Sequence, residues 1–136
     1  MPNKDMNSVE TCMSRAKEVF PELDFENNYI DNPYTLFQEL VDLLHREYDK
    51  NTIDRNNLKK IYDFAEWSCN LPRGETAKND VLTAVAVSFL EHVPQHPGAF
   101  KDLPNWFKKE EIVKSKELFS YHIGEEKYNE LLRLYK

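Results

Sequence analysis

The four histidines are the side chains of this sequence best suited to acid–base or metal chemistry. His92 and His96 are four residues apart and follow Glu91, and this spacing places two imidazoles on one face of an unbroken helix. Pro94 lies between them and should end such a helix, because proline lacks a backbone N–H and clashes with the preceding turn. We therefore expect an ordinary polar loop and no metal site.

His45 has a different neighbourhood, with Asp42 and Asp49 about one helical turn to either side. Carboxylates so placed raise the affinity of an imidazole for a proton or a cation. The alternative is a solvated polar face, in which Asp42 and Arg46 form an i, i+4 ion pair. Surface charges usually belong to such a face, so we favour this interpretation.

Common catalytic motifs are absent from the sequence. Its three isolated glycines form neither GxxxxGK[ST] nor GxGxxG, and neither HExxH nor GxSxG occurs. Ser88 and Thr83 lie in the most apolar segment without an adjacent base, which is typical of core hydroxyls bonded to carbonyls. Cys12 and Cys69 show no CxxC spacing, which favours reduced thiols. We expect no intrinsic catalysis, no metal and no cofactor.

The elements that would position these residues are predicted to be helices. Only three glycines occur in 136 residues, while seven prolines mostly separate periodic apolar segments. A hairpin-rich fold needs more turn residues with positive φ. We expect one compact all-α domain over residues 1–136, with about five to seven helices and a flexible arm over residues 1–7. An α-solenoid-like stacking of helix pairs is the alternative arrangement.

Capping residues and apolar periodicity predict the bounds of these helices. The pair Asp31-Asn32 caps a helix that Pro33 begins, and Thr52 caps the next one. The following helix is apolar around nearly its whole circumference, which predicts a central position in the domain. Helices are expected over residues 8–20, 33–48, 52–70, 76–92, 108–120 and 125–135.

The excess negative charge lies in the first two-fifths of the chain. The net charge is −6, but residues 1–54 contain five basic and twelve acidic residues, whereas residues 55–136 contain 13 and 12. This balance argues against DNA, RNA and membrane surfaces as partners. We expect a docking surface for a basic protein, because charge raises association rates. Its residues are Glu22, Asp24, Glu26, Glu39, Asp42 and Asp49.

The predicted helix over residues 52–70 carries a second apolar stripe. Phe64, Trp67 and Leu71 lie nearly opposite the stripe that contains Tyr62. Large aromatic side chains usually serve packing, so a position between two layers is favoured over an exposed interface. A pocket between helices near Tyr62 and Trp67 is the basis of the alternative function, a small-molecule-binding or regulatory enzyme.

The compartment is expected to be the cytosol. No stretch approaches the roughly 18 apolar residues of a membrane span, and the segment MPNKDMNSVE lacks the apolar core of a secretory signal.

Three segments carry a family resemblance: Phe20-Pro21-Glu22-Leu23, Phe64-Ala65-Glu66-Trp67, and Ala86-Val87-Ser88-Phe89-Leu90-Glu91. They resemble a family of small, acidic, all-helical bacterial proteins of uncharacterised function. The resemblance implies a bacterial cytosolic protein and supplies no catalytic residues. By analogy of class, it also implies an inhibitor that neutralises a basic toxin. The expected function is a non-catalytic protein-binding module that neutralises such a toxin or regulates a partner through its acidic N-terminal face.

Overall fold

The computed structural model describes residues 7–135, which contain eight α-helices and no strand. The predicted all-α class is confirmed. Four shorter helical segments join the α-helices: three 3-10 turns (η1, η3 and η4) and one π-helix (η2). The α-helices are α1 (Ser8–Val19), α2 (Pro33–Tyr48), α3 (Arg55–Cys69), α4 (Val81–Val85), α5 (Pro97–Asp102), α6 (Lys109–Lys114), α7 (Lys116–Ser120) and α8 (Gly124–Arg133). The connecting segments are η1 (Ala77–Asn79), η2 (Ala86–Leu90), η3 (Val93–Gln95) and η4 (Leu103–Asn105).

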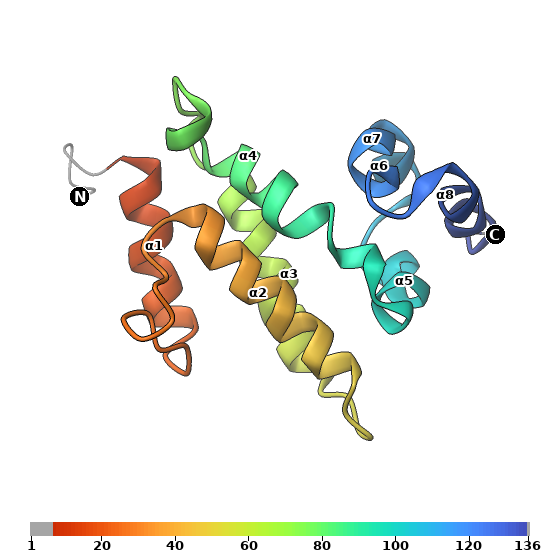
Figure 1. Ribbon diagram of the computed structural model, residues 1–136, viewed down its shortest axis with the longest axis horizontal. Helices are drawn as coiled ribbons and strands as arrows, with labels where there is room; N and C mark the ends of the chain where they lie inside the picture. Colours follow the sequence, from red (N-terminus) through yellow and green to blue (C-terminus); the bar gives the residue numbers. More distant parts are fainter. Residues whose placement is uncertain (1–6, 136) are drawn as a thin grey trace.

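The first four helices enclose the main part of the core. Each of α1, α2, α3 and α4 contacts the other three, and η2 continues α4 along α2 (Figure 1). In an α-solenoid each helix pair contacts only its neighbours, so this part of the chain is a bundle instead. The short helices α5 to α8 gather at the other end of the molecule (Figure 1). No helix within residues 7–135 is long and apolar enough to cross a membrane.

The start of α3 differs from the prediction. Asp54, and not Thr52, caps the helix, since its side chain accepts a hydrogen bond from the backbone N–H of Asn56. The buried carboxylate of Glu47, near the end of α2, accepts the backbone N–H of Asp54 at 2.9 Å. This bond between the end of α2 and the start of α3 fixes the point at which the chain turns into α3, and capping preference could not reveal it. At the N-terminus, Asn7 caps α1, and the rest of the expected flexible arm lies outside the described residues.

The helix predicted over residues 76–92 begins later, at Val81. The preceding residue, Asp80, is buried, and its carboxylate binds the guanidinium of Arg73, the backbone N–H of Gly74 and the hydroxyl of Thr83. These bonds hold residues 73–80 in a loop that contains the turn η1. The Thr83 hydroxyl therefore donates to a carboxylate, where a bond to a backbone carbonyl was expected.

The central position of this helix is confirmed only in part. Val81, Ala84, Val85 and Phe89 are buried against the bundle. Val87, however, is 37% exposed, so the apolar circumference is not fully enclosed. One side of η2 faces solvent because α2, α7 and Tyr62 of α3 cover only its other sides.

The C-terminal half contains more helices than predicted, because one expected helix is divided and a further helix forms where none was predicted. At Ser115 the backbone turns (φ −108°, ψ 35°), which separates α6 from α7. The further helix is α5, which follows the polar loop expected around His96. Its first residue, Pro97, suits the start of a helix, and the His96 side chain accepts the backbone N–H of Gly98.

Asp102, at the end of α5, connects this half to the bundle. Its carboxylate accepts hydrogen bonds from the Tyr48 hydroxyl, from both terminal nitrogens of Arg55, and from the indole N–H of Trp106 at 2.9 Å. Burial opposes ionisation of Asp102, but these hydrogen bonds outweigh it and lower its pKa. The pKa of the Tyr48 hydroxyl is raised by burial and by the adjacent carboxylate. One ionised side chain thus joins α2, α3 and η4.

Candidate binding surfaces

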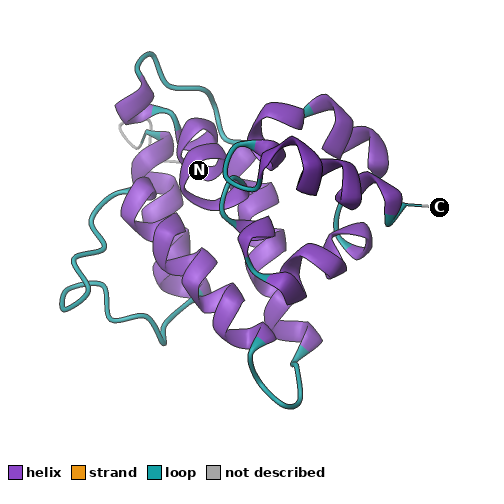
Figure 2. Cartoon of the chain, turned by 45° about the vertical axis from the view of Figure 1, so that its right-hand side comes forward, coloured by secondary structure: helices purple, strands orange, loops and turns teal. Residues whose placement is uncertain are grey.

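The loop between α1 and α2 carries three of the predicted docking residues and one exposed aromatic side chain. This loop projects from the helices at the left of Figure 2. Tyr29 is 81% exposed and has a φ of +56°, a left-handed conformation that is costly for a residue with a Cβ. The loop is ordered by the Asp24 carboxylate, which accepts the backbone N–H of Asn27, and by a bond from Ile30 N–H to the Phe25 carbonyl.

The charged residues of the loop around Tyr29 are all acidic. No Lys or Arg occurs from Glu18 to His45, whereas the loop itself contains Glu22, Asp24, Glu26 and Asp31, all exposed. Glu22 is paired with Lys60 of α3 at 3.1 Å. Tyr29 therefore stands in a segment that offers carboxylates and no cation of its own.

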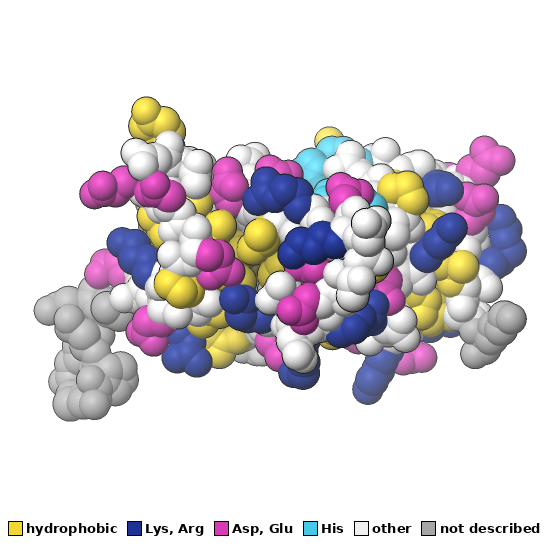
Figure 3. Space-filling view, turned by 90° about the horizontal axis from the view of Figure 1, so that it is seen from below, with side chains coloured by type: hydrophobic (Ala, Val, Ile, Leu, Met, Phe, Trp, Pro, Cys, Tyr) yellow, Lys and Arg dark blue, Asp and Glu magenta, His cyan; other side chains and the backbone are white. Residues whose placement is uncertain are grey.

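The other three predicted acidic residues are Glu39 and Asp42 on α2 and Asp49 just after its last residue, and they do not all lie beside this loop. Asp42 is exposed and faces η2 and η3, and on the same side Asp49 contacts His96 at 2.7 Å. Glu22 instead borders a small hollow with Leu43 on another side of α2. The structure thus distributes the six predicted residues around α2 and does not gather them on one face. Figure 3 likewise shows acidic and basic side chains interspersed over the face it presents.

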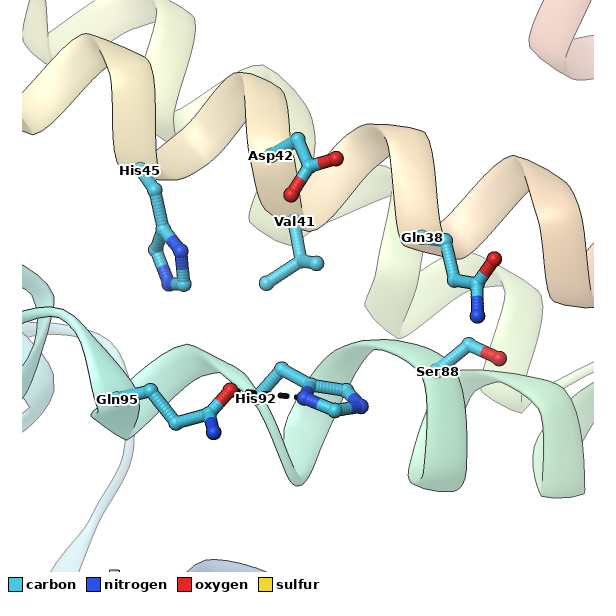
Figure 4. A pocket seen from close by; sticks show the side chains of 7 residues that line it. All are labelled: Gln38, Val41, Asp42, His45, Ser88, His92 and Gln95. Atoms are coloured by element: carbon cyan, nitrogen blue, oxygen red, sulfur yellow. Dashed lines mark hydrogen bonds between the residues drawn. The ribbon is translucent and has the colours of Figure 1, made fainter. Parts of the chain in front are cut away.

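A polar groove of about 270 Å³ separates α2 from η2 and η3, as Figure 4 shows. His92 Nδ1 is 2.8 Å from the side-chain oxygen of Gln95, and His45 Nε2 is 3.2 Å from the carbonyl of Val93. The residues that line the groove are Gln38, Val41, Asp42, His45, Ser88, His92 and Gln95.

The four histidines form two ring pairs next to this groove. The ring centroids of His45 and His96 are 5.3 Å apart, and those of His92 and His122 are 4.4 Å apart. The histidine side chains accordingly gather near one edge of the molecule in Figure 3. The sequence showed the spacing of His92 and His96 but not these two pairings, which join residues up to 51 positions apart.

Asp42 and Asp49 favour protonation of His45, as their spacing predicts, but they do not decide its pKa. The pKa of His45 is lowered, chiefly because the ring is partly buried and further because His96 is near, although the Val93 carbonyl and both carboxylates oppose this. Within residues 7–135, no three His, Cys, Asp or Glu side chains are grouped as metal ligands would be.

The second apolar stripe is divided between two environments. Phe64 is 4% exposed and packs against Phe20 of the α1 end and Phe37 of α2, at ring distances of 5.3 and 5.7 Å. Trp67 and Leu71 are half-buried, and the Arg15 guanidinium of α1 lies 5.7 Å from the Trp67 ring centroid. The favoured interpretation, that the stripe lies between two layers, agrees with these contacts.

Tyr62 faces a different element and lines a cleft between α3 and the C-terminal half. The cleft has a volume of about 350 Å³. Trp67 is not among its residues and borders a separate hollow with Arg15 and Phe64, so Tyr62 and Trp67 line two different hollows and do not share the predicted pocket. The residues that line it are Tyr62, Asp63, Ala65, Glu66, Cys69, Val85, Leu90, Trp106, Phe107, Glu111, Ser115 and Phe119.

The nucleophilic side chains of the described region are poorly placed for catalysis. Burial raises the pKa of the Cys12 and Cys69 thiols to about 11, so both are protonated at neutral pH. Ser88 is 4% exposed and makes no hydrogen bond to His92 or to another base among residues 7–135.

Fold and surfaces thus define an all-α domain with an acidic aromatic loop, a polar groove and an aromatic cleft. The chain belongs to the DUF7674 family, a domain of unknown function, whose model matches residues 13–119. The match extends from within α1 to within α7 and therefore includes all three surfaces. No match is found among curated proteins or among solved structures.

Proposed function

We propose that this domain is a non-catalytic protein-binding module of the cytosol. It docks a basic protein partner through the acidic loop between α1 and α2 and through the predicted acidic residues of α2. The observation that carries the proposal is Tyr29, which is 81% exposed in a segment that contains carboxylates and no Lys or Arg.

Tyrosine is enriched among the residues that dominate binding energy, because it buries a large rigid surface and keeps a polar tip. The carboxylates of Asp24, Glu26 and Asp31 surround it in sequence and complement Lys and Arg side chains of a partner. The internal bonds of the loop keep Tyr29 in place before binding, which reduces the entropy lost on association.

Neutralisation of a basic toxin is the particular form of this function that the family resemblance favours, together with a bacterial origin. A regulatory role toward another basic protein requires the same surface. Identification of the captured partner distinguishes the two, because a toxin loses its activity when the domain is bound.

The test begins with capture of the partner from the native host by the immobilised full chain, followed by binding kinetics of variants. Tyr29→Ala should accelerate dissociation, with a loss of affinity of about tenfold or more. The double reversal Glu39→Lys and Asp42→Lys should slow association and reduce its salt dependence. Glu117→Lys, an exposed reversal on α7, is the matched control and should leave the kinetics near those of the unaltered chain.

A partner that binds all of these variants equally well, and also in high salt, would show that the acidic segment is only a solvated surface. Selective loss with Glu117→Lys would place the interface on the C-terminal half instead.

A further inference from the structure

The cleft between α3 and residues 106–119 combines an aromatic floor with an acidic rim. We propose that it binds a small organic cation, an ammonium group attached to an apolar or aromatic body. This site is separate from the acidic loop, and it does not depend on the function proposed for that loop.

The floor of the cleft is a fixed aromatic platform. Tyr62 and Trp106 are stacked with ring centroids 4.8 Å apart, and Phe107 meets Tyr62 edge-on at 5.7 Å. Trp106 is held by its indole hydrogen bond to Asp102. Such a platform offers apolar area to the body of a bound molecule. Recognition of charge falls to the rim, because the faces of Tyr62 and Trp106 contact each other and the Arg55 guanidinium lies over the Trp106 ring, 5.4 Å from its centroid.

The rim carries three carboxylates, from Asp63, Glu66 and Glu111, and no Lys, Arg or His among residues 7–135 lines the cleft. Asp63 is paired with Lys59, whereas Glu66 and Glu111 have no ion-pair partner among the described residues. The Glu111 side chain is held by a bond from the backbone N–H of Lys108.

This acidity is a local feature of the cleft. Residues 55–136 contain 13 basic and 12 acidic residues, so the surrounding half of the chain has a slight excess of positive charge. A rim with carboxylates alone is therefore not the consequence of an acidic background.

These features select one ligand class. An anion is repelled by the rim, and a neutral apolar molecule gains the aromatic contact but leaves the carboxylates without a partner. An ammonium with an apolar body satisfies both. The volume of about 350 Å³ lies near the lower end of small-molecule sites, which favours a single ring with a short ammonium chain.

The fluorescence of Trp106 reports directly whether a ligand occupies the cleft. In a Trp67→Phe variant of the full chain, Trp106 is the one remaining tryptophan, so its fluorescence reports the cleft alone. The probes are 2-phenylethylammonium, the uncharged 2-phenylethanol and the anion 3-phenylpropionate. We expect saturable binding of the ammonium, at least about tenfold tighter than that of the alcohol, and no binding of the anion.

Two rim variants test the charge contribution. Glu66→Gln and Glu111→Gln should each weaken ammonium binding about threefold to tenfold and leave the affinity for the alcohol unchanged. Glutamine at position 111 still accepts the Lys108 N–H, and circular dichroism checks that each variant is folded. Glu117→Gln, which removes an exposed carboxylate outside the cleft, is the control and should have no effect.

The absence of saturable binding of the ammonium would overturn the proposal. Equal affinity for the ammonium and the alcohol, or an equal effect of Glu117→Gln and the rim variants, would also refute it. These outcomes leave the proposed protein-binding function untouched, because none of the altered residues belongs to the acidic loop or to α2.

Discussion

Removal of the Asp102 carboxylate should destabilise the domain far more than an average substitution near the surface. The Asp102→Ala variant leaves the hydroxyl of buried Tyr48 and the indole N–H of half-buried Trp106 without an acceptor. It also removes the ion pair with Arg55, whose side chain is 52% exposed.

The magnitude follows from the burial of each donor. A buried donor without an acceptor costs about 1–3 kcal/mol, and this applies fully to Tyr48 and in part to Trp106. Arg55 can be hydrated again, so its ion pair contributes at most about 1 kcal/mol. Together these contributions predict a loss of about 2–5 kcal/mol in the free energy of unfolding.

Urea denaturation followed by circular dichroism measures this loss. In the background of Tyr48→Phe, which has no hydroxyl to leave unpaired, Asp102→Ala should cost clearly less. Asp49→Ala is the control, since that carboxylate is 68% exposed and contacts His96, and it should cost less than about 1 kcal/mol. A loss below about 1 kcal/mol for Asp102→Ala, or strict additivity with Tyr48→Phe, would refute the reasoning.

Three further predictions concern the core, the titration of the fold and a turn. Phe89→Ala should reduce the free energy of unfolding by about 3–5 kcal/mol, because the ring is fully buried. Val87→Ala, at an exposed position of the same π-helix, should cost less than about 1 kcal/mol. Chemical denaturation measures both losses. The pKa of His45 is lower in the folded state than its unfolded value near 6.5, so the unfolded state takes up the proton first. The free energy of unfolding should therefore fall as the pH drops below about 6.5. His45→Gln should flatten this part of the stability profile, and an unchanged profile would contradict the assignment. Gly124 begins α8 with a φ of +87°, so Gly124→Ala should lower the melting temperature through about 1 kcal/mol of backbone strain, although no atom lies near the added Cβ.

Much of the secondary structure could be predicted from local signals. α2 begins at Pro33 behind the Asn32 cap and ends at Tyr48, as its periodicity and capping residues indicate. The bounds were less accurate wherever a buried carboxylate outside the helix decides them. The bond of Glu47 to Asp54 sets the start of α3, and the bonds of Asp80 delay the start of α4.

The positions of the candidate surfaces could be predicted only in part from such local signals. The sequence showed that Phe64 and Tyr62 lie on opposite sides of one helix, but not which side would meet α1 and which would border a cleft. Tyr29 gave no signal at all, because an exposed aromatic residue in a loop cannot be distinguished from a buried one by its neighbours in the chain.

The sequence by itself determined the all-α class, the main helices and the confinement of the excess negative charge to the first two-fifths of the chain, since periodicity, caps and composition are local properties. Only the tertiary structure decided that Val87 is exposed, that the four histidines pair beside one groove and that Asp102 joins three elements. Helical spacing determines which residues share a face. Which faces meet depends on the simultaneous packing of all the helices, and that packing brings together side chains about 30 to 54 positions apart.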